Sequence, residues 1–96
     1  MVYSVFYSEE FEEHIFEIEY YYRNFESDSR AEKVLKSIIK CIESIQKQPE
    51  MFPFETSYKF VGNRKAVVHQ TFVIYFKIMT KTDIMIIDII HGKINI

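Results

Sequence analysis

The sequence predicts an α+β domain in which a two-helix hairpin covers one face of an antiparallel sheet. Three observations support this fold class. A short aromatic and β-branched run opens the chain, two amphipathic helical patterns follow, and three further apolar runs of strand length lie in the C-terminal half. The expected order is β-α-α-β-β-β in one domain, residues 1–96, because this length suits one domain and not two.

The first strand is expected over residues 2–7, "VYSVFY". Ser8 is expected to cap the helix that follows, because a serine side chain accepts a hydrogen bond from the first helical turn. Two glutamates come directly after it, where negative charge suits the helix dipole. Apolar side chains then recur at helical spacing, namely Phe11, Ile15, Ile18 and Tyr22. The helix is predicted to end at about Asn24, and its other faces are acidic.

The second helix is predicted to begin at a cap formed by Asp28 or Ser29, and Ser29 has the capping-box spacing to Glu32. It should end before Pro49, which cannot continue a helix. Its apolar stripe contains Ala31, Val34, Leu35, Ile38, Cys41, Ile42 and Ile45. Because the connection between the helices is short, we expect an antiparallel hairpin. The residues buried between the layers should include Ile15, Ile18, Leu35, Ile38, Ile42 and Ile45.

Three strands are predicted after an irregular crossing, over residues 58–69, 71–79 and 84–91. Their short links, including a turn at residues 80–83, favour an antiparallel meander. The first of them contains Gly62, which is typical of a kink or bulge in a strand.

The last two strands are apolar on both sides. In one, Phe72, Ile74, Phe76 and Ile78 alternate with Val73, Tyr75, Lys77 and Met79; in the other, Ile84, Ile86, Asp88 and Ile90 alternate with Met85, Ile87, Ile89 and His91. The helices can cover only one face of the sheet, so the other face is expected to expose apolar side chains. Such a patch usually marks a partner site. A homodimer or a dedicated partner chain would cover it.

Charge divides the chain into two halves. Residues 1–50 carry 6 Lys and Arg against 11 Asp and Glu, whereas residues 51–96 carry 6 against 3, which together give the net charge of −2. An acidic partner would therefore meet the C-terminal half. The single cysteine, Cys41, excludes an internal disulfide and is expected in the core.

No apolar run approaches the length of a membrane span, and the N-terminus lacks a cationic leader pattern, so we expect a cytoplasmic protein without a membrane partner. The three histidines are far apart in the sequence and match no metal-ligand spacing, and no nucleotide-binding glycine motif occurs. Neither a metal nor a cofactor is therefore expected.

Four segments, taken in order, resemble the RelE/ParE superfamily of bacterial type II toxins. They are "IQKQPEMFP", "GNRKAVV", "FVIYFKI" and "IIDIIHGKIN", and the resemblance covers almost the whole chain. It implies the toxin of a plasmid stabilisation-like toxin–antitoxin module. Such a toxin is neutralised by a cognate antitoxin, usually a small protein that wraps it with a helical segment.

Two features favour the ParE-like branch over the mRNA-cleaving branch. The mRNA-cleaving relatives are strongly basic and carry an arginine just before the "VIY"-like segment, where this chain has Phe72 and a sequence pI of about 5.9. ParE-like members show a G-x-R-R strand start and an H-G-x-R-D-like end. The matching residues are Gly62, Arg64 and Lys65 for the first pattern and, more loosely, His91, Gly92 and Asn95 for the second.

The resemblance implies a toxin that binds a protein target such as DNA gyrase and is not an enzyme. A second hypothesis is a ribosome-dependent mRNA endoribonuclease, with ribosome and mRNA as partners. In that case Arg64 and Lys93 would hold phosphate and His91 would exchange the proton. A third is a detoxified relative that acts only as a binding partner, in a homodimer or a toxin–antitoxin hetero-oligomer.

The predicted partner-binding residues are Arg64, Lys65, Val73, Tyr75, Met79 and Met85. In a meander, Arg64 and His91 fall at opposite edges of the sheet, about 17 Å apart for strands of ordinary length. These charges are therefore expected to border an apolar docking face and not to form one compact catalytic centre.

Overall fold

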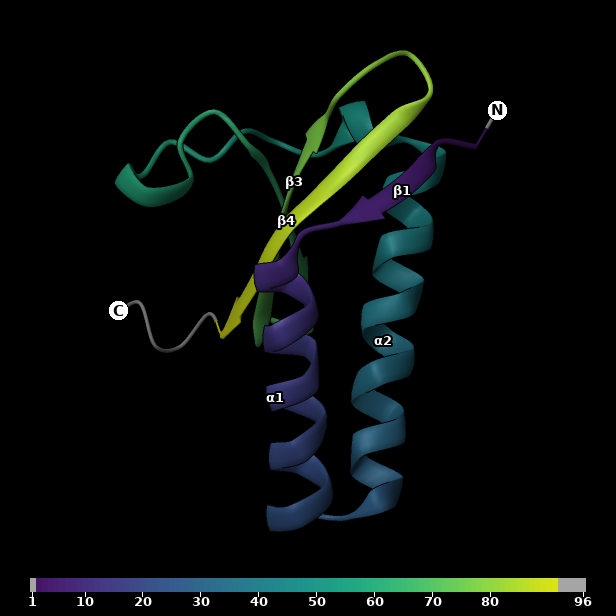
Figure 1. Cartoon of the computed structure of the whole chain (residues 1–96), viewed down its shortest axis with the longest axis vertical. Helices are drawn as coiled ribbons and strands as arrows, with labels where there is room; N and C mark the ends of the chain where they lie inside the picture. The colour runs from purple at the N-terminus through teal and green to yellow at the C-terminus, as the bar shows by residue number, and fades with distance from the viewer. Residues whose placement is uncertain (1, 92–96) are drawn as a thin grey trace.

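The computed structural model describes residues 2–91 and has the predicted α+β order (Figure 1). The elements are β1 (Ser4–Tyr7), α1 (Glu9–Phe25), α2 (Asp28–Lys47), the short 3₁₀ turns η1 (Pro49–Met51) and η2 (Tyr58–Phe60), β2 (Arg64–Val68), β3 (Phe72–Ile78) and β4 (Asp83–His91). The predicted fold class is confirmed.

The four strands form one sheet in the order β1-β4-β3-β2. The predicted meander is correct, because β2–β3 and β3–β4 are antiparallel pairs. The expectation of a wholly antiparallel sheet is wrong for the first strand, which pairs with β4 and runs parallel to it, from Ser4 opposite Asp83 to Tyr7 opposite Ile86. The sheet is therefore mixed, with its antiparallel part in the C-terminal half of the chain.

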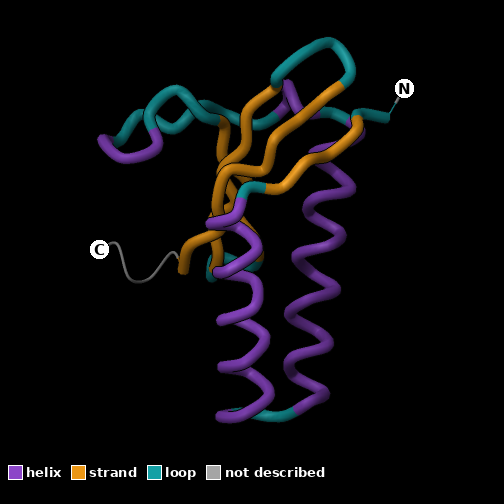
Figure 2. The backbone as a smooth tube through the Cα atoms, viewed as in Figure 1, coloured by secondary structure: helices purple, strands orange, loops and turns teal. Residues whose placement is uncertain are grey.

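The two helices form a hairpin that extends beyond one end of the sheet (Figure 2). Ser8 caps α1 as predicted, and its side chain accepts a hydrogen bond from the Phe11 amide at 3.0 Å. The cap of α2 is Ser27, not Asp28 or Ser29, and it accepts from the Arg30 amide at 3.0 Å. Ser29 lies inside the helix and Ser27 is the last extended residue before it, so the capping box with Glu32 does not form.

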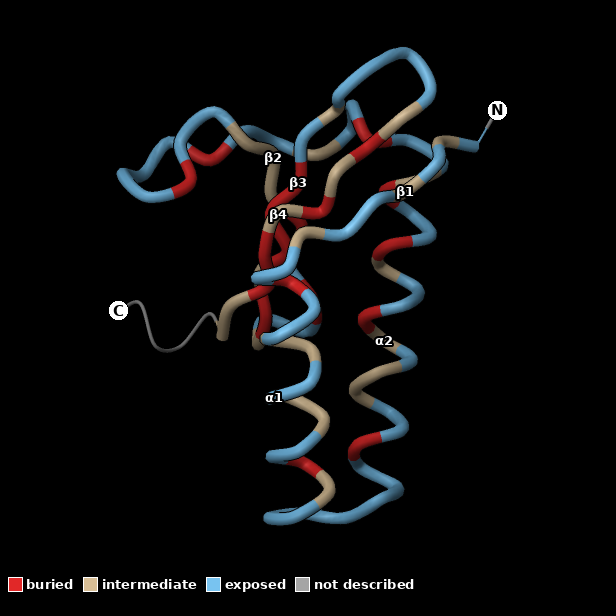
Figure 3. Tube along the Cα trace, in the orientation of Figure 1, coloured by how far each residue is buried: buried red, intermediate tan, exposed pale blue. Residues whose placement is uncertain are grey.

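The core lies between the sheet and the helices (Figure 3). Of the residues expected there, Ile38, Ile42 and Ile45 are buried, whereas Ile15, Ile18 and Leu35 are half-buried. The largest fully buried side chains also include Phe76, Ile74, Ile84, Ile86 and Ile89. Near the end of α1, Tyr22 is the aromatic residue that packs into the core. Tyr20, Tyr21 and Phe25 lie on the exposed side of the helix.

A β-bulge changes the expected alternation of β4. The register of β3 and β4 shifts between Tyr75, which pairs with Asp88, and Phe76, which pairs with Ile86, so Ile87 has no partner of its own. Beyond the bulge Ile89 lies opposite the buried Ile74. The prediction that Ile84, Ile86, Asp88 and Ile90 share one side of the strand is therefore wrong after the bulge.

The expected strand over residues 58–69 is shorter in the structure. Residues 58–60 form a 3₁₀ turn, Gly62 adopts a φ of 90°, and β2 begins only at Arg64. The glycine in a left-handed conformation separates the turn from the strand, because other residues rarely adopt this geometry. Among the described residues, no helix is long and apolar enough to span a membrane.

Candidate functional site

The sheet face away from the helices is partly covered by residues 52–63, here called the crossing segment. In Figure 2 this segment extends outward as a long loop with a short helical turn. It doubles back on itself through two backbone hydrogen bonds: the Glu55 amide donates to the Asn63 carbonyl at 2.7 Å, and the Gly62 amide donates to the Glu55 carbonyl at 3.3 Å.

The Glu55 carboxylate holds the crossing segment on the sheet. It accepts hydrogen bonds from the amides of Thr56 and Ser57 and from the Tyr75 hydroxyl, each at 3.0 Å, and Lys65 Nζ lies 3.6 Å away. The Ser57 backbone bond, with smaller contributions from Tyr75 and Lys65, lowers the pKa of Glu55 to about 2. Although Glu55 is buried, it is therefore an ionised and well-satisfied carboxylate at neutral pH.

Tyr75 lies beneath the crossing segment and is not part of the exposed surface. Its ring stacks on that of Phe60 with the centroids 4.0 Å apart, and only 6% of the residue is exposed. Burial, together with the bond to Glu55, raises the pKa of Tyr75 to about 12. The prediction that Tyr75 contributes to an exposed sheet face is wrong, because the crossing segment covers it.

Arg64 anchors the beginning of the same segment. Its guanidinium donates to the carbonyls of Phe52 at 2.8 Å and Glu50 at 3.3 Å, and it lies 4.1 Å from the centre of the Phe54 ring. Lys65 pairs with Glu55. Both cations at the start of β2 therefore have partners within the chain and stabilise its own fold.

A strip of apolar side chains on this side of the sheet stays open. It comprises the exposed Phe6, Val67 and Met79 and the half-buried Val73 and Met85, and we call it the open sheet face. The strand register supports a common face, because Phe6 lies opposite Met85 and Val67 lies opposite Val73. Three of the predicted partner-binding residues, Val73, Met79 and Met85, belong to it.

His91 lies far from Arg64 along the sheet. His91 pairs with Phe72 and Arg64 pairs with Phe76, so the two are separated by four positions of β3, roughly 13 Å. The His91 ring packs edge-on against the core residue Phe72 at 5.4 Å. Gly92, Lys93 and Asn95 lie outside the described residues.

Asp88, three positions before His91, bonds to a different histidine. Its Oδ1 lies 2.5 Å from Nδ1 of His14 on α1 and accepts the Ile89 amide at 2.8 Å. The two residues lie 74 positions apart, so no local sequence pattern indicates this contact. Within residues 2–91, Asp88 therefore orients His14 and not His91.

Sequence reasoning missed the residues that build the crossing segment, chiefly Glu55, Phe54 and Phe60. The "FETS" string carried no clear signal, because the side chains typical of such turns are the shorter Asn and Asp. Its contacts with Lys65 and Tyr75 arise only in the folded chain.

Two further expectations concern metals and cysteine chemistry. The described residues contain no cluster of His, Cys, Asp and Glu suited to a metal ion. Cys41 is half-buried against the core, and burial raises the pKa of its thiol to about 11. A thiol of that pKa is protonated at neutral pH and is a poor nucleophile.

Comparisons with known proteins show one matching family and one shared fold. The model of the family described as "ParE toxin of type II toxin-antitoxin system, parDE" matches residues 5–96. Among solved structures, the chain is similar to one titled "Chromosomal ParDE TA system from P. aeruginosa", with a TM-score of 0.77 and 16% identity over 94% of this chain and 96% of that one. No curated protein matches the sequence significantly.

Proposed function

The chain belongs to the ParE toxin family of type II toxin–antitoxin systems, and on this basis we propose that an antitoxin holds it inactive by docking on the open sheet face. The observation that carries the proposal is the exposure of large apolar side chains there: Phe6, Val67 and Met79 are 52%, 58% and 52% exposed. Several large apolar side chains exposed on one face of a sheet favour a protein partner.

The chemistry around the strip fits an acidic, amphipathic antitoxin segment. Lys77 lies on the same side of β3 and is exposed. Of the two cations at the start of β2, Lys65 is paired with Glu55 and Arg64 with backbone carbonyls. Lys77 is thus better placed than either to attract a partner's carboxylate, while the apolar strip supplies most of the affinity.

We further propose that the free toxin acts by binding a protein target, with DNA gyrase as the first candidate. Arg64 and His91 lie at opposite ends of β3 and the Arg64 guanidinium is already bound to carbonyls, which speaks against a phosphate-holding and proton-exchanging pair. The single most informative test is a parallel assay of gyrase supercoiling and ribosome-dependent mRNA cleavage with the purified chain. Inhibition of supercoiling without cleavage supports the proposal.

His91→Ala separates the two mechanisms in cells. The proposal expects growth inhibition to persist, because His91 has no part in binding a protein target. Loss of growth inhibition with an unchanged circular dichroism spectrum, together with ribosome-dependent cleavage by the unmodified chain, would establish the endoribonuclease instead. Arg64→Glu is a poorer test, because it also removes the hydrogen bonds to the carbonyls of Phe52 and Glu50 and so changes the fold of the crossing segment.

The docking surface is tested by Met79→Glu, with Met51→Glu as its matched control. Met79 is 52% exposed on the open sheet face, whereas Met51 is 71% exposed near the end of α2. The proposal expects Met79→Glu to weaken antitoxin binding at least tenfold, about the effect of a buried interface residue, and Met51→Glu to leave it unchanged. Equal effects would place the antitoxin elsewhere.

Light scattering supplies an independent check. An uncovered apolar strip should make the isolated chain dimerise or aggregate at high concentration, and the antitoxin should suppress this. A monodisperse monomer at high concentration would argue against the open sheet face as a docking surface.

A further inference from the structure

A second, chemically different surface lies between α2 and the turn that joins β2 to β3. It is a groove of about 510 Å³. Its α2 wall carries four cations, Arg30, Lys33, Lys36 and Lys40, and its other wall carries His69 and Thr71. No carboxylate is among the residues that line it. In a chain of net charge −2, this concentration of one sign is a distinct feature.

The helical repeat separates the charges of α2 by sign. At 3.6 residues per turn, the four groove cations fall within an arc of about 120°, and the three carboxylates of α2, Asp28, Glu32 and Glu43, fall outside it. The cation row from Arg30 to Lys40 is about 15 Å long. Within residues 2–91, none of the three groove lysines forms an ion pair, and Arg30 has one pair, to Glu26 at 3.6 Å. The positive charge is therefore available to a ligand.

The second wall of the groove is a tight turn that is hydrogen-bonded to α2. His69 and Gln70 have φ values of 51° and 59°, and the Thr71 amide donates to the Val68 carbonyl at 2.9 Å. Two left-handed residues in succession are typical of a tight hairpin turn. His69 Nε2 lies 2.8 Å from Ser37 Oγ on α2, so the turn is joined to the helix. The groove is thus held between two connected elements.

The floor of the groove offers a ligand little apolar surface. Tyr22, Val68 and Phe72 are only 8%, 5% and 3% exposed. An amphipathic peptide would find no pocket for its apolar side chains, and single-stranded nucleic acid would find no open aromatic ring on which to stack its bases. The accessible groups are the cations of α2, which bind phosphate oxygens, whereas the hydroxyls of Ser37 and Thr71 already donate to the carbonyls of Lys33 and His69.

We propose that this groove binds the sugar–phosphate backbone of duplex DNA, without sequence preference. A row of cations along a helix suits repeated phosphates. The site differs from the open sheet face in position and in chemistry. The toxin would thereby contact DNA directly, in addition to its protein partners.

The test is the fluorescence anisotropy of two unrelated labelled 20-base-pair duplexes, titrated with the full chain at two salt concentrations. Four phosphate contacts predict a slope of log K against log salt of about −3.6, which weakens binding roughly 50-fold between 50 and 150 mM salt. Both duplexes should bind equally.

The groove variant is the triple substitution Lys33→Gln, Lys36→Gln and Lys40→Gln. All three residues are exposed, and glutamine has nearly the helix propensity of lysine, so the fold should be retained. Its control is Lys47→Gln, Lys59→Gln and Lys81→Gln, which removes the same charge from exposed positions outside the groove. The groove variant should lose at least tenfold in affinity at 50 mM salt and reduce the slope to about −1. The control should change affinity less than twofold.

Three outcomes would overturn the proposal: no salt-dependent binding to either duplex, equal losses in both triple variants, or tight binding of a polyglutamate peptide without binding of DNA. The last result would assign the groove to an acidic protein. None of these outcomes affects antitoxin binding or gyrase inhibition, which are measured separately, so the proposed function and this inference can fail independently.

Discussion

Helix α2 buries four side chains in the core, Ala31, Ile38, Ile42 and Ile45, whereas α1 buries only Phe11 and Tyr22. Hydrogen bonds to β4 supplement the packing of α1. The Ser8 hydroxyl donates to the Ile87 carbonyl, and His14 bonds to Asp88, which is itself buried. The two helices of one hairpin therefore depend on different forces: α2 depends mainly on apolar burial, and α1 depends in part on hydrogen bonds, of which the His14–Asp88 bond responds to pH.

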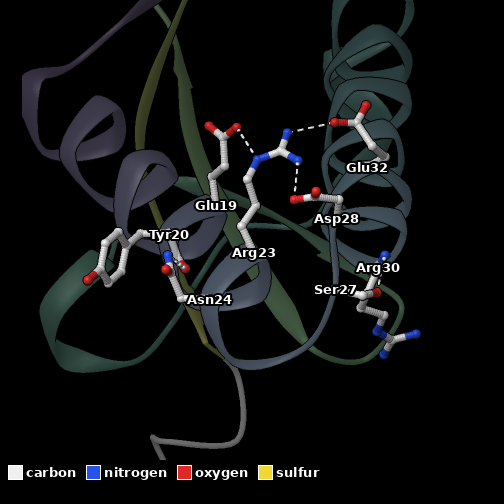
Figure 4. Close-up of polar contacts among 8 residues, drawn as sticks. All are labelled: Glu19, Tyr20, Arg23, Asn24, Ser27, Asp28, Arg30 and Glu32. Carbon is white, nitrogen blue, oxygen red and sulfur yellow. Dashed lines mark hydrogen bonds and ion pairs between the residues drawn. The ribbon is translucent and has the colours of Figure 1, made fainter.

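Their outward surfaces also differ in charge. Helix α1 carries six glutamates and one arginine, a balance of −5, and α2 carries five cations and three carboxylates, a balance of +2. Arg23 joins the two near the hairpin turn through Glu19, Asp28 and Glu32 (Figure 4). The buried side chains lie on the core faces and the charges on the solvent faces, so the packing of each helix gives no guide to the charge of the partner that it attracts.

The largest expected effect comes from a charge placed in the core under α2. Ile38 is 2% exposed, so Ile38→Asp buries an unpaired carboxylate, which costs several kcal/mol against a total stability of about 5–15 kcal/mol. The variant should be unfolded by circular dichroism. The neighbouring Ile39 is 54% exposed, and Ile39→Asp should fold normally. A soluble Ile38→Asp variant with native thermal stability would contradict the layering.

A smaller loss is expected from α1. Phe11 is 5% exposed and packs beside Tyr7, so Phe11→Ala should cost about 3–5 kcal/mol in urea unfolding. Phe16→Ala removes the same ring from a position that is 68% exposed and should change stability by less than about 0.5 kcal/mol. If both variants lose equal stability, the exposed face of α1 is packed against another surface, such as a second copy.

The pH dependence of the protein's stability should arise mainly from His14 on α1. The hydrogen bond to Asp88, aided by the charges of Asp88, Glu17 and Glu13, raises the pKa of His14 above 6.5. A raised pKa means that this stabilisation is complete below pH 6.5 and is lost as the pH rises through the folded-state pKa. The urea midpoint of the wild type should therefore fall as the pH rises above 6.5, and His14→Gln should flatten this decrease.

The control for this pH effect is His69→Gln, because His69 contacts Ser37 and not a carboxylate. The urea midpoint of His69→Gln should fall above pH 6.5 as that of the wild type does. An unchanged pH profile in His14→Gln would show that the His14–Asp88 bond contributes nothing to stability.

The smallest effect is expected at the hairpin turn. Arg23→Gln removes three ion pairs, but its partners are largely exposed, and such pairs contribute little and are screened by salt. The Tm should decrease slightly at low salt and match that of the wild type at about 1 M salt. Arg30→Gln, which loses one pair with Glu26 at 3.6 Å, should change it less. A salt-independent loss would mean that Arg23 packs against the helices through its aliphatic chain.

The local part of the fold was predictable from the sequence. Helical spacing and the Ser8 cap located α1, and Pro49 located the end of α2. The short links between the last three strands predicted the meander, and the register then separated Arg64 from His91 as expected. The α2 cap was misplaced by one or two residues, because the consecutive residues Ser27, Asp28 and Ser29 are all good capping residues.

The candidate site was predictable only in part. Val73, Met79 and Met85 follow from strand alternation, because side chains on a strand point alternately to its two faces. Tyr75 follows the same alternation, yet the crossing segment buries it. No sequence pattern within β3 indicates that Tyr75 is covered, because its burial depends on Glu55 and Phe60, which lie 20 and 15 positions away.

By itself, the sequence determined the elements, the fold class and the family resemblance, because caps, periodicity and turn residues act over a few neighbouring positions. The tertiary structure alone decided the parallel place of β1, the bulge at Ile87, the His14–Asp88 bond and the groove between α2 and the β2–β3 turn. Each of these joins residues far apart in the chain. Their proximity depends on the packing of whole layers, which no local pattern encodes.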